Sequence, residues 1–373
     1  MLGLYIGSTQ FKAGKSLCAC SMGVLLQRRG LKVGYMKPVG HSMKLVEEGC
    51  GDADALVVQE VLGQEAAPEV LTPLLCPANW NSFILASSKG ALKQPDSCRE
   101  EPEGAECGKL EEVAAAYASI AKGKDLMMVS GSGTFPSAGQ FAGANGMALA
   151  ERLDLRVILV ENCEETINSD ELLYARRCLG ERLAGTILNK LAPSDIPLCA
   201  EWLTPYLEGH GVKVLGMIPH DPELNIIRSM NLAYELGGRI VAGNAAASAQ
   251  GITGFLIGSM QVESFMMHLR SKNACAIVVG GDRTDLQLAA LYGGSGNCLV
   301  LTGNLGPHEL VRSKAEQQGV PIIVVKEDTY VVARRISRIL KGQKFNDLEQ
   351  INRGIGLFER SVNLDKILEA VKE

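Results

Sequence analysis

The chain has 373 residues, of which 46% are hydrophobic and 21% charged, and its formal net charge is -5 at pH 7. This length fits two domains, each able to bury its own hydrophobic core. Nucleic acid and anionic membranes bind surfaces with clustered positive charge, and this acidic chain shows no such basic stripe. Both are therefore disfavoured as partners. The 11 cysteines form no CxxC pair, and we expect reduced thiols in a cytoplasmic protein.

Strand and helix patterns alternate through the first part of the chain. An apolar strand over residues 2–7 is followed by a helix over 16–29, in which apolar residues recur at helical spacing. Further strands are predicted at residues 32–37, 126–129, 157–160 and 186–188, with helical patterns between them. This alternation predicts an α/β fold with a mainly parallel sheet, helices on both faces and ligands at the carboxyl ends of the strands.

A second and smaller alternation begins after a small, polar segment at residues 243–250 that is typical of a linker. Its predicted strands and helices alternate over residues 276–279, 285–292, 298–302, 307–318, 322–325 and 330–340. The chain then ends in helical segments. We therefore predict a nucleotide-binding domain at residues 1–243, a smaller α/β domain at 250–340 and a helical tail at 341–373.

The segment Thr9 to Ser16, TQFKAGKS, is typical of a phosphate-binding loop between the first strand and the first helix. Such a loop needs small residues whose backbone N–H groups face phosphate oxygens, a lysine for the phosphate charge and a hydroxyl for magnesium. Gly14, Lys15 and Ser16 supply all three. Thr9 stands where the usual spacing of such loops has a glycine. The alternative is a junction of strand, turn and helix that contains the letters GKS by chance and binds no phosphate.

Three charged residues accompany the loop in the sequence. Lys37 follows a predicted strand just before Pro38, so it would project at the edge where the loop opens, although a solvated lysine at a strand end is the alternative. Asp52 and Asp54 lie directly before a helix, where capping explains such residues equally well. Two carboxylates at this position could also bind magnesium.

Together these segments resemble a known family. Residues 8–16 (STQFKAGKS), 35–40 (YMKPVG) and 52–54 (DAD) are similar, in order and spacing, to motifs of dethiobiotin synthetase and its relatives, including the amino-terminal domain of long phosphotransacetylases. The resemblance implies that Lys37 is catalytic and faces the reacting carboxylate and phosphate. It also implies that Asp54 helps to hold magnesium, and that Asn189, in the segment TILNKL, reads the nucleotide base. Capping of a turn is the alternative for Asn189.

The chain departs from this family at Ser130, where relatives usually have a glutamate that binds magnesium. A serine hydroxyl is a much weaker partner for a hard dication. The later segment GGDRTD, residues 280–285, resembles the DRTGG domain, whose role in long phosphotransacetylases is regulatory or related to assembly. On the residues alone, Asp282 and Arg283 could instead pair with each other and cap a helix.

The sequence therefore favours a regulatory or sensory protein that binds ATP, or another nucleoside triphosphate, with Mg²⁺ and without transacetylase activity. Thr9, Gly14, Lys15, Ser16 and Asn189 are the expected nucleotide ligands, and Ser16 also serves magnesium. The alternative is an ATP-dependent, carboxylate-activating ligase, and a third reading is a scaffold without nucleotide. A homo-oligomer is implied by the resemblance. Hydrolysis, a second substrate, the ligand of the DRTGG domain and the choice between ATP and GTP are left open.

Overall fold

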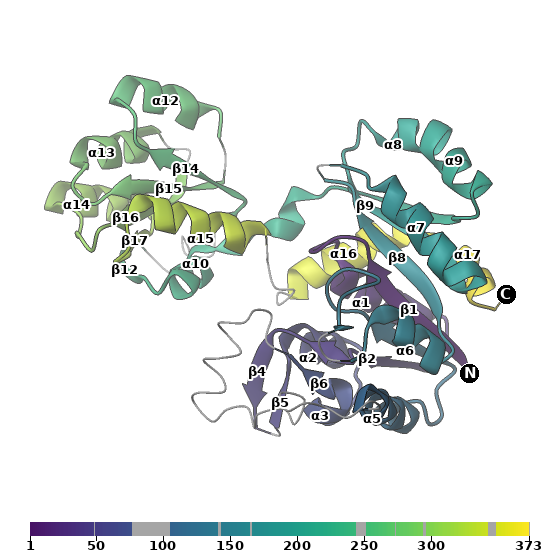
Figure 1. Ribbon diagram of the computed structural model, residues 1–373. Coiled ribbons are helices and arrows are strands. Elements are labelled where there is room, and N and C mark those ends of the chain that lie inside the picture. Colours follow the sequence, from purple (N-terminus) through teal and green to yellow (C-terminus); the bar gives the residue numbers. More distant parts are fainter. Residues whose placement is uncertain are drawn as a thin grey trace. The chain divides into compact units, whose positions relative to one another are not determined.

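The structure is a computed structural model, and its ribbon is drawn in Figure 1. It describes residues 1–47, 49–76, 105–140, 143–164, 166–243, 251–272, 274–293, 296–341 and 348–372. The chain divides into two compact units. The first consists of Met1–His220 together with Lys344–Glu373, and the second of Asp221–Gln343.

A six-stranded parallel sheet forms the centre of the first unit, as the alternation of strand and helix predicts. Its strands lie in the order β10-β9-β8-β1-β7-β2, and every neighbouring pair runs parallel. Their bounds are β1 Leu2–Ser8, β2 Val33–Met36, β7 Leu126–Ser130, β8 Arg156–Asn162, β9 Leu183–Leu191 and β10 Val214–Pro219. The strand that leads into the loop, β1, is therefore central, and the ends of β7 and β8 flank it.

One face of this sheet is covered by α5 (Ala105–Ile120), α6 (Gly146–Arg152), α7 (Ser169–Leu179) and α9 (Thr204–Gly209). Side chains from these helices form one buried cluster with alternate residues of the strands, among them Tyr5, Met127 and Leu159. Alternate residues share a face because side chains along a strand point in opposite directions. The shorter α8, Ile196–Leu198, precedes α9 along the chain.

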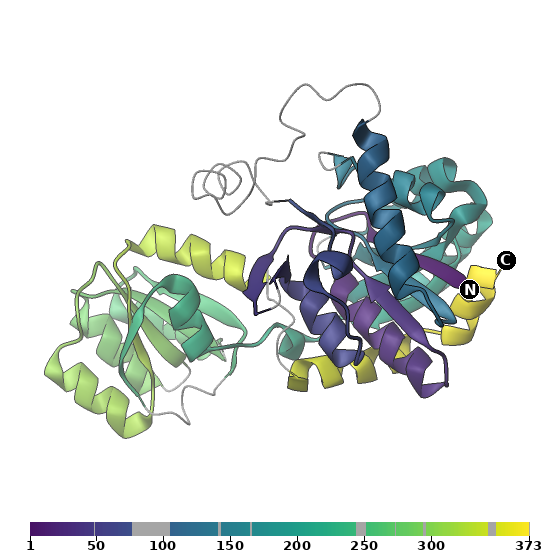
Figure 2. The same cartoon turned by 90° about the horizontal axis from the view of Figure 1, so that it is seen from below.

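The opposite face carries α1 (Lys15–Arg28) and the helices of the tail, α16 (Leu348–Ser361) and α17 (Leu364–Lys372), and Figure 2 shows α1 and α16 on the side away from α5. Gly354 of α16 lies against Leu17 of α1, and Val362 bridges to Gly216 of β10. Arg29 pairs with Asp365 at 2.5 Å. The tail therefore belongs to the core of the first unit.

Smaller elements lie between β2 and β7. The antiparallel pair β4 (Met43–Val46) and β5 (Gly49–Asp52) leads directly into α2 (Ala53–Val61). The parallel pair β3 (Val39–Gly40) and β6 (Leu74–Leu75) lies on either side of α3, Pro68–Leu71, in the sequence. The turn between β5 and α2 places Asp52 at the helix amino terminus.

A second, mostly parallel sheet forms the second unit, in the order β12-β17-β16-β15-β14. Its parallel strands are β14 Gly254–Gly258, β15 Cys275–Gly280, β16 Gly296–Thr302 and β17 Ile322–Val324. Helices α12 (Val262–Arg270), α13 (Thr284–Gly293) and α14 (Glu309–Gln318) pack on one face. Helices α10 (Ser229–Leu236) and α15 (Thr329–Lys341) pack on the other.

The edge strand β12, Arg239–Ala242, pairs antiparallel with β17, and β11 (Ile227–Arg228) pairs with β13 (Gly251–Ile252). The compact second unit therefore begins at Asp221, whereas the sequence analysis places the domain boundary at 243. The residues that follow the proline-marked turn after β10 belong to the second unit, since β11 pairs with β13 and β12 joins the second sheet. Residues 244–250 of the expected linker lie outside the described residues.

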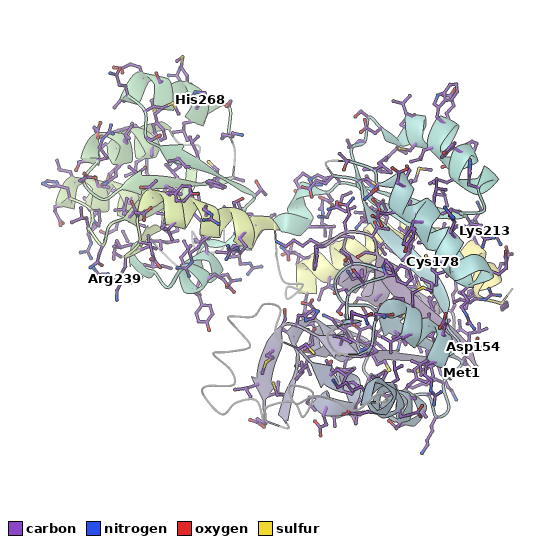
Figure 3. The ribbon with its side chains drawn as sticks, viewed as in Figure 1. Met1, Asp154, Cys178, Lys213, Arg239 and His268 are labelled. Carbon is purple, nitrogen blue, oxygen red and sulfur yellow. The ribbon has the colours of Figure 1, made fainter. Side chains whose placement is uncertain are left out.

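The cysteines whose side chains the structure describes are free. Most are buried, whereas Cys178 is exposed on α7 and is labelled in Figure 3. Burial raises the pKa of the Cys163 thiol to about 12, so this thiol stays protonated at neutral pH. Within the described residues, no helix is both long and apolar enough to cross a membrane.

The contact between α1 and α16 is tested by two glycines of α16. A Cβ at Gly354 would overlap Leu17, whereas a Cβ at Gly356 would meet only the end of the Arg360 side chain, at 3.6 Å. Gly356→Ala is expected to stabilise the protein by up to about 1 kcal/mol through helix propensity. Gly354→Ala is expected to lose roughly 1–3 kcal/mol from overpacking. Urea unfolding of the two variants measures this, and equal stabilities would contradict the packing of the tail on α1.

Candidate functional site

The phosphate-binding loop joins the end of β1 to the start of α1. Gly14 is the residue before the helix and has a φ of 92°, a conformation that favours glycine because it has no Cβ. A Cβ at this position would also overlap Nδ2 of Asn189. Both the backbone angle and the available space therefore select glycine here, as the sequence motif predicts.

Lys15 turns its side chain back over the loop. Its Nζ donates to Ser8 Oγ and to the carbonyl oxygen of Gly133, each at 2.7 Å. Burial, followed by the positive charge of Lys37, lowers the pKa of Lys15 to about 8. The described residues place no carboxylate within ion-pair distance of this ammonium, so its charge is available to an anion at the loop. Ser16 follows half-buried in the first helical turn.

Lys37 lies near Lys15 in a compact group with two carboxylates. Its Nζ is 2.7 Å from Asp52 Oδ1 and 3.5 Å from Asp54 Oδ2. The Asp52 side chain is fully buried, whereas that of Asp54 is 27% exposed. The structure thus brings Lys37 and Asp54 together, and Asp54 is the more accessible of the two acids.

Asp52 is the residue that caps α2. Its carboxylate accepts the backbone N–H groups of Asp54 and Ala55 in the helix and those of His41 and Ser42 in the preceding loop. Burial alone would raise its pKa, but the charge of Lys37 and these hydrogen bonds outweigh it and hold the pKa below its ordinary value. The capping alternative is therefore the one that the geometry supports for Asp52.

Ser130 ends β7 beside the loop, where relatives usually have a glutamate. The residue is 1% exposed, and its hydroxyl, which lies near that of Tyr35, makes no well-formed hydrogen bond to any described residue. It pairs in register with Ile6 of β1, so it lies beside the strand that leads into the loop. The following residues place the carbonyl oxygen of Gly133 on Lys15.

Glu161 is a member of the site that the sequence analysis missed. It lies near the end of β8 with no exposed surface, and Thr9 Oγ1 donates a hydrogen bond to its Oε2. Gln10 Nε2 and the backbone N–H of Asn168 each donate to its Oε1 at 3.0 Å. Burial is the main cause that raises its pKa to about 7. The sequence feature that could have revealed Glu161 is its position directly after the apolar run at residues 157–160. An acid there lies at the edge of the sheet where ligands bind.

Asn189 lies in β9, on the other side of the loop. Its Nδ2 donates to the carbonyl oxygen of Ala13 at 2.7 Å, and its Oδ1 accepts the backbone N–H of Lys190 at 2.9 Å. The amide thus holds the loop backbone next to Gly14. Recognition of a nucleotide base by Asn189 stays a prediction.

The motif of the second unit lies between β15 and α13. Arg283 binds Asp285 through two hydrogen bonds, of 3.0 and 2.8 Å, so its ion pair is with this residue and not with Asp282. Gln287, fully buried below, donates to the carbonyl oxygens of Gly280 and Gly281. The Gln287 amide therefore holds the loop before α13 in place.

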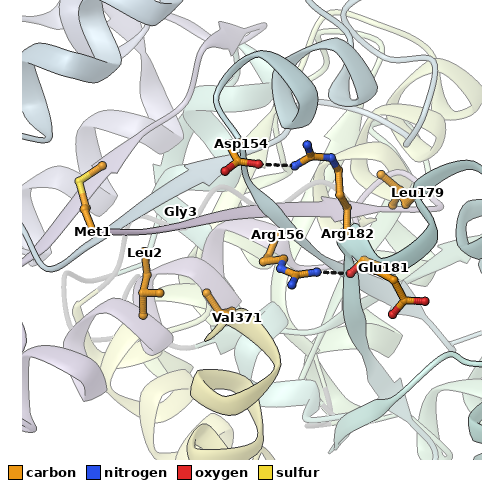
Figure 4. A pocket seen from close by; sticks show the side chains of 9 residues that line it. All are labelled: Met1, Leu2, Gly3, Asp154, Arg156, Leu179, Glu181, Arg182 and Val371. Carbon is orange, nitrogen blue, oxygen red and sulfur yellow. Dashed lines mark hydrogen bonds and ion pairs between the residues drawn. The ribbon is translucent and has the colours of Figure 1, made fainter. Parts of the chain in front are cut away.

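A cavity of about 450 Å³ lies near the amino ends of β1, β8 and β9, at the edge of the sheet opposite the loop. Figure 4 shows Arg182 paired with Asp154, at 2.7 Å, and Arg156 donating to the carbonyl oxygen of Glu181. Its basic groups are thus already engaged within the protein, and none of the residues predicted for nucleotide binding lines it.

The buried pair of Asp52 and Lys37 leads to a prediction for stability. Asp52→Asn leaves Lys37 without its closest anion and is expected to lower the free energy of unfolding at pH 7 by roughly 3–5 kcal/mol. Because the folded-state pKa of Asp52 is depressed, its contribution is present above the unfolded pKa and is lost as pH falls through the folded value. The difference from wild type should therefore shrink below about pH 4.

Denaturant unfolding at several pH values measures this difference, and Asp54→Asn is the matched control. Its partly exposed side chain lies farther from Lys37, so its effect should be clearly smaller. An equal loss in both variants, or a loss for Asp52→Asn that does not change with pH, would contradict this account of the pair.

Two family models match the chain. Residues 2–228 match a model described as an AAA domain, and residues 231–339 match the DRTGG domain. Curated relatives include the phosphate acetyltransferases of Pseudomonas putida, 28% identical over 94% of this chain and 49% of that protein, and of Synechocystis, 20% identical over 99% of this chain and 52% of that protein. The chain thus spans about half the length of these relatives.

Solved structures give weaker likenesses. The CBS and DRTGG domains of the regulatory region of Clostridium perfringens pyrophosphatase, complexed with the activator diadenosine tetraphosphate, are 12% identical and have a TM-score of 0.28, covering 41% of this chain and 72% of that one. MinD of Aquifex aeolicus is 14% identical with a TM-score of 0.35, covering 60% and 84%. These TM-scores are too low to support an inference about ligands.

Proposed function

The chain belongs to the AAA domain family of P-loop proteins and continues into a DRTGG domain, like the amino-terminal half of phosphate acetyltransferases, and from this premise we propose that it is a regulatory protein that senses ATP. The observation that carries the proposal is Lys15, a half-buried ammonium held by two neutral oxygens beside Gly14. A triphosphate would supply the anion that this charge lacks.

Magnesium fits the proposal. Asp54 presents a carboxylate that is partly accessible, and Ser16 stands at the position where a phosphate loop offers its hydroxyl to the metal. These two residues would hold Mg²⁺, which would offset the phosphate charge. The carboxylate of Asp52 is already occupied by Lys37 and four backbone N–H groups, so we assign it no metal.

Binding is favoured over turnover for two reasons. Lys37 is held by Asp52 and Asp54, which compete with any substrate for its charge, and Ser130 offers a hydroxyl where a stronger metal ligand is expected. Our proposal for these 373 residues concerns nucleotide binding and not acetyl transfer. The cytoplasmic location, the homo-oligomer and the exclusion of nucleic acid and membrane partners stay predictions from the sequence.

The alternative is an ATP-dependent, carboxylate-activating ligase. The observation in its favour is that Lys37 lies close enough to Lys15 for the two charges to interact, and that Asp54 acts on both lysines. Two cations and one accessible acid are a set that could stabilise a transferred phosphoryl group. Lys37 would then be the catalytic residue.

Titration of the protein with ATP, with and without Mg²⁺, tests the proposed binding. Lys15→Ala should weaken binding at least about 100-fold, because it removes the buried charge-assisted contact to phosphate, and Lys326→Ala of the second unit is the control. Wild-type protein that binds no nucleoside triphosphate would refute both the sensor and the ligase.

Turnover separates the two proposals. A sensor should release little phosphate from ATP, with or without an added carboxylic acid, and Lys37→Ala should leave that background unchanged. Phosphate release that rises on addition of a carboxylic acid, and that is lost in Lys37→Ala and in Asp54→Ala, would favour the ligase instead. A coupled phosphate assay at saturating ATP measures this.

A further inference from the structure

The site contains a buried acid that the proposed function does not yet use. Glu161 is 0% exposed, and its two carboxylate oxygens accept from Thr9 and Gln10 of the phosphate-binding loop. Thr9 is the residue that stands where the usual motif has glycine. The two observations are connected, because the hydroxyl of Thr9, which a glycine at this position would lack, donates a hydrogen bond to Glu161.

This acid differs from the other buried acid of the site in its surroundings. Asp52 is neutralised by Lys37, whereas no ion pair with Glu161 is found among the described residues. The titratable groups that act on it are Glu171 of α7, which further raises its pKa, and the neutral thiol of Cys163. Lys190 of β9 is engaged by Glu164 at 3.1 Å. A negative charge on Glu161 is thus stabilised only by hydrogen bonds.

A chain of hydrogen bonds connects Glu161 to the phosphate-binding lysine. Lys15 Nζ donates to Ser8 Oγ, which donates to the carbonyl oxygen of Gln10 at 2.7 Å. The Gln10 side chain in turn donates to Glu161. The acid and the lysine thus belong to one hydrogen-bond network, in which Glu161 contacts the start of the loop and Lys15 stands at its end.

Resting on the proposed nucleotide binding, we propose that Glu161 positions the phosphate-binding loop and takes up protons from solvent when a nucleoside triphosphate binds, so that affinity falls as pH rises. In each molecule that takes up a proton, the carboxylate becomes a carboxylic acid, and no other bond is made or broken. A bound polyanion disfavours a second buried negative charge nearby. The protonated acid still accepts one hydrogen bond from the loop and can donate another.

The pH dependence of binding follows from the direction in which the bound triphosphate would change the pKa of Glu161. The pKa of Glu161 is about 7 in the free protein; if the triphosphate raises it by about one unit, binding at pH 7 takes up about 0.4 proton. The affinity then falls roughly five-fold between pH 6 and pH 8. The pKa of Lys15 is about 8, so loss of its positive charge weakens binding further, mainly above pH 8.

Titration calorimetry with MgATP at pH 6, 7 and 8 tests the proposal. The variant Glu161→Gln keeps the shape and a hydrogen-bonding oxygen but cannot titrate. The ratio of wild-type to variant affinity should fall roughly five-fold from pH 6 to pH 8, since contributions of Lys15 and of the nucleotide cancel in the ratio. Glu164→Gln is the matched control, because this exposed acid lies three residues away and should leave the wild-type profile unchanged.

Proton uptake is measured directly by repeating the wild-type titration at pH 7 in buffers of different ionisation enthalpy. This arm needs no variant, so it decides the proposal even if Glu161→Gln does not fold. An uptake below about 0.1 proton, or parallel pH profiles of wild type and Glu161→Gln, would overturn the role of Glu161 and leave nucleotide binding intact. Absence of MgATP binding at every pH would instead overturn the proposed function itself.

Discussion

The ammonium of Lys15, half-buried and bound only by neutral oxygens, is the constraint on which the first unit depends. Its hydrogen bonds to Ser8 and Gly133 draw together the ends of two neighbouring strands, β1 and β7. A parallel sheet brings these ends to one edge, and the helix that starts at the same lysine adds the positive end of its dipole there. The loop therefore concentrates positive potential in a place that excludes much of the solvent.

The two buried acids beside this loop, Asp52 and Glu161, differ in what stabilises their negative charge. Asp52 is paired with Lys37 and caps a helix, so its charge is permanent and its role is to hold structure. Glu161 has hydrogen bonds but no counter-charge among the described residues. Its charge is therefore easier to change than that of Asp52. A single site thus contains one fixed and one adjustable negative charge.

The sequence predicted the local features of the site well. The loop, the glycine at position 14 and the order of strands and helices follow from short-range patterns, because backbone conformation and hydrophobic period are local properties. The contact between Thr9 and Glu161 joins residues 152 positions apart, and no spacing rule reports such a contact. For Asp52, the sequence alone left capping and metal binding as equal alternatives, since both need an acid before a helix.

The helical segments of the tail were predicted, but the expected break near Gly354 and Gly356 is wrong, because α16 runs through both glycines over Leu348–Ser361. The partner of these helices was not predicted, because an amphipathic pattern states that a face is buried and not against what. In the structure, α16 and α17 return to the first unit after the second unit has been completed. The second unit is in this sense an insertion into the first. Because these two helices follow the second unit in the chain, the sheet bearing the phosphate loop is covered on both faces only after they have packed onto it. Folding of the first unit therefore cannot be completed by the residues that precede the second unit alone.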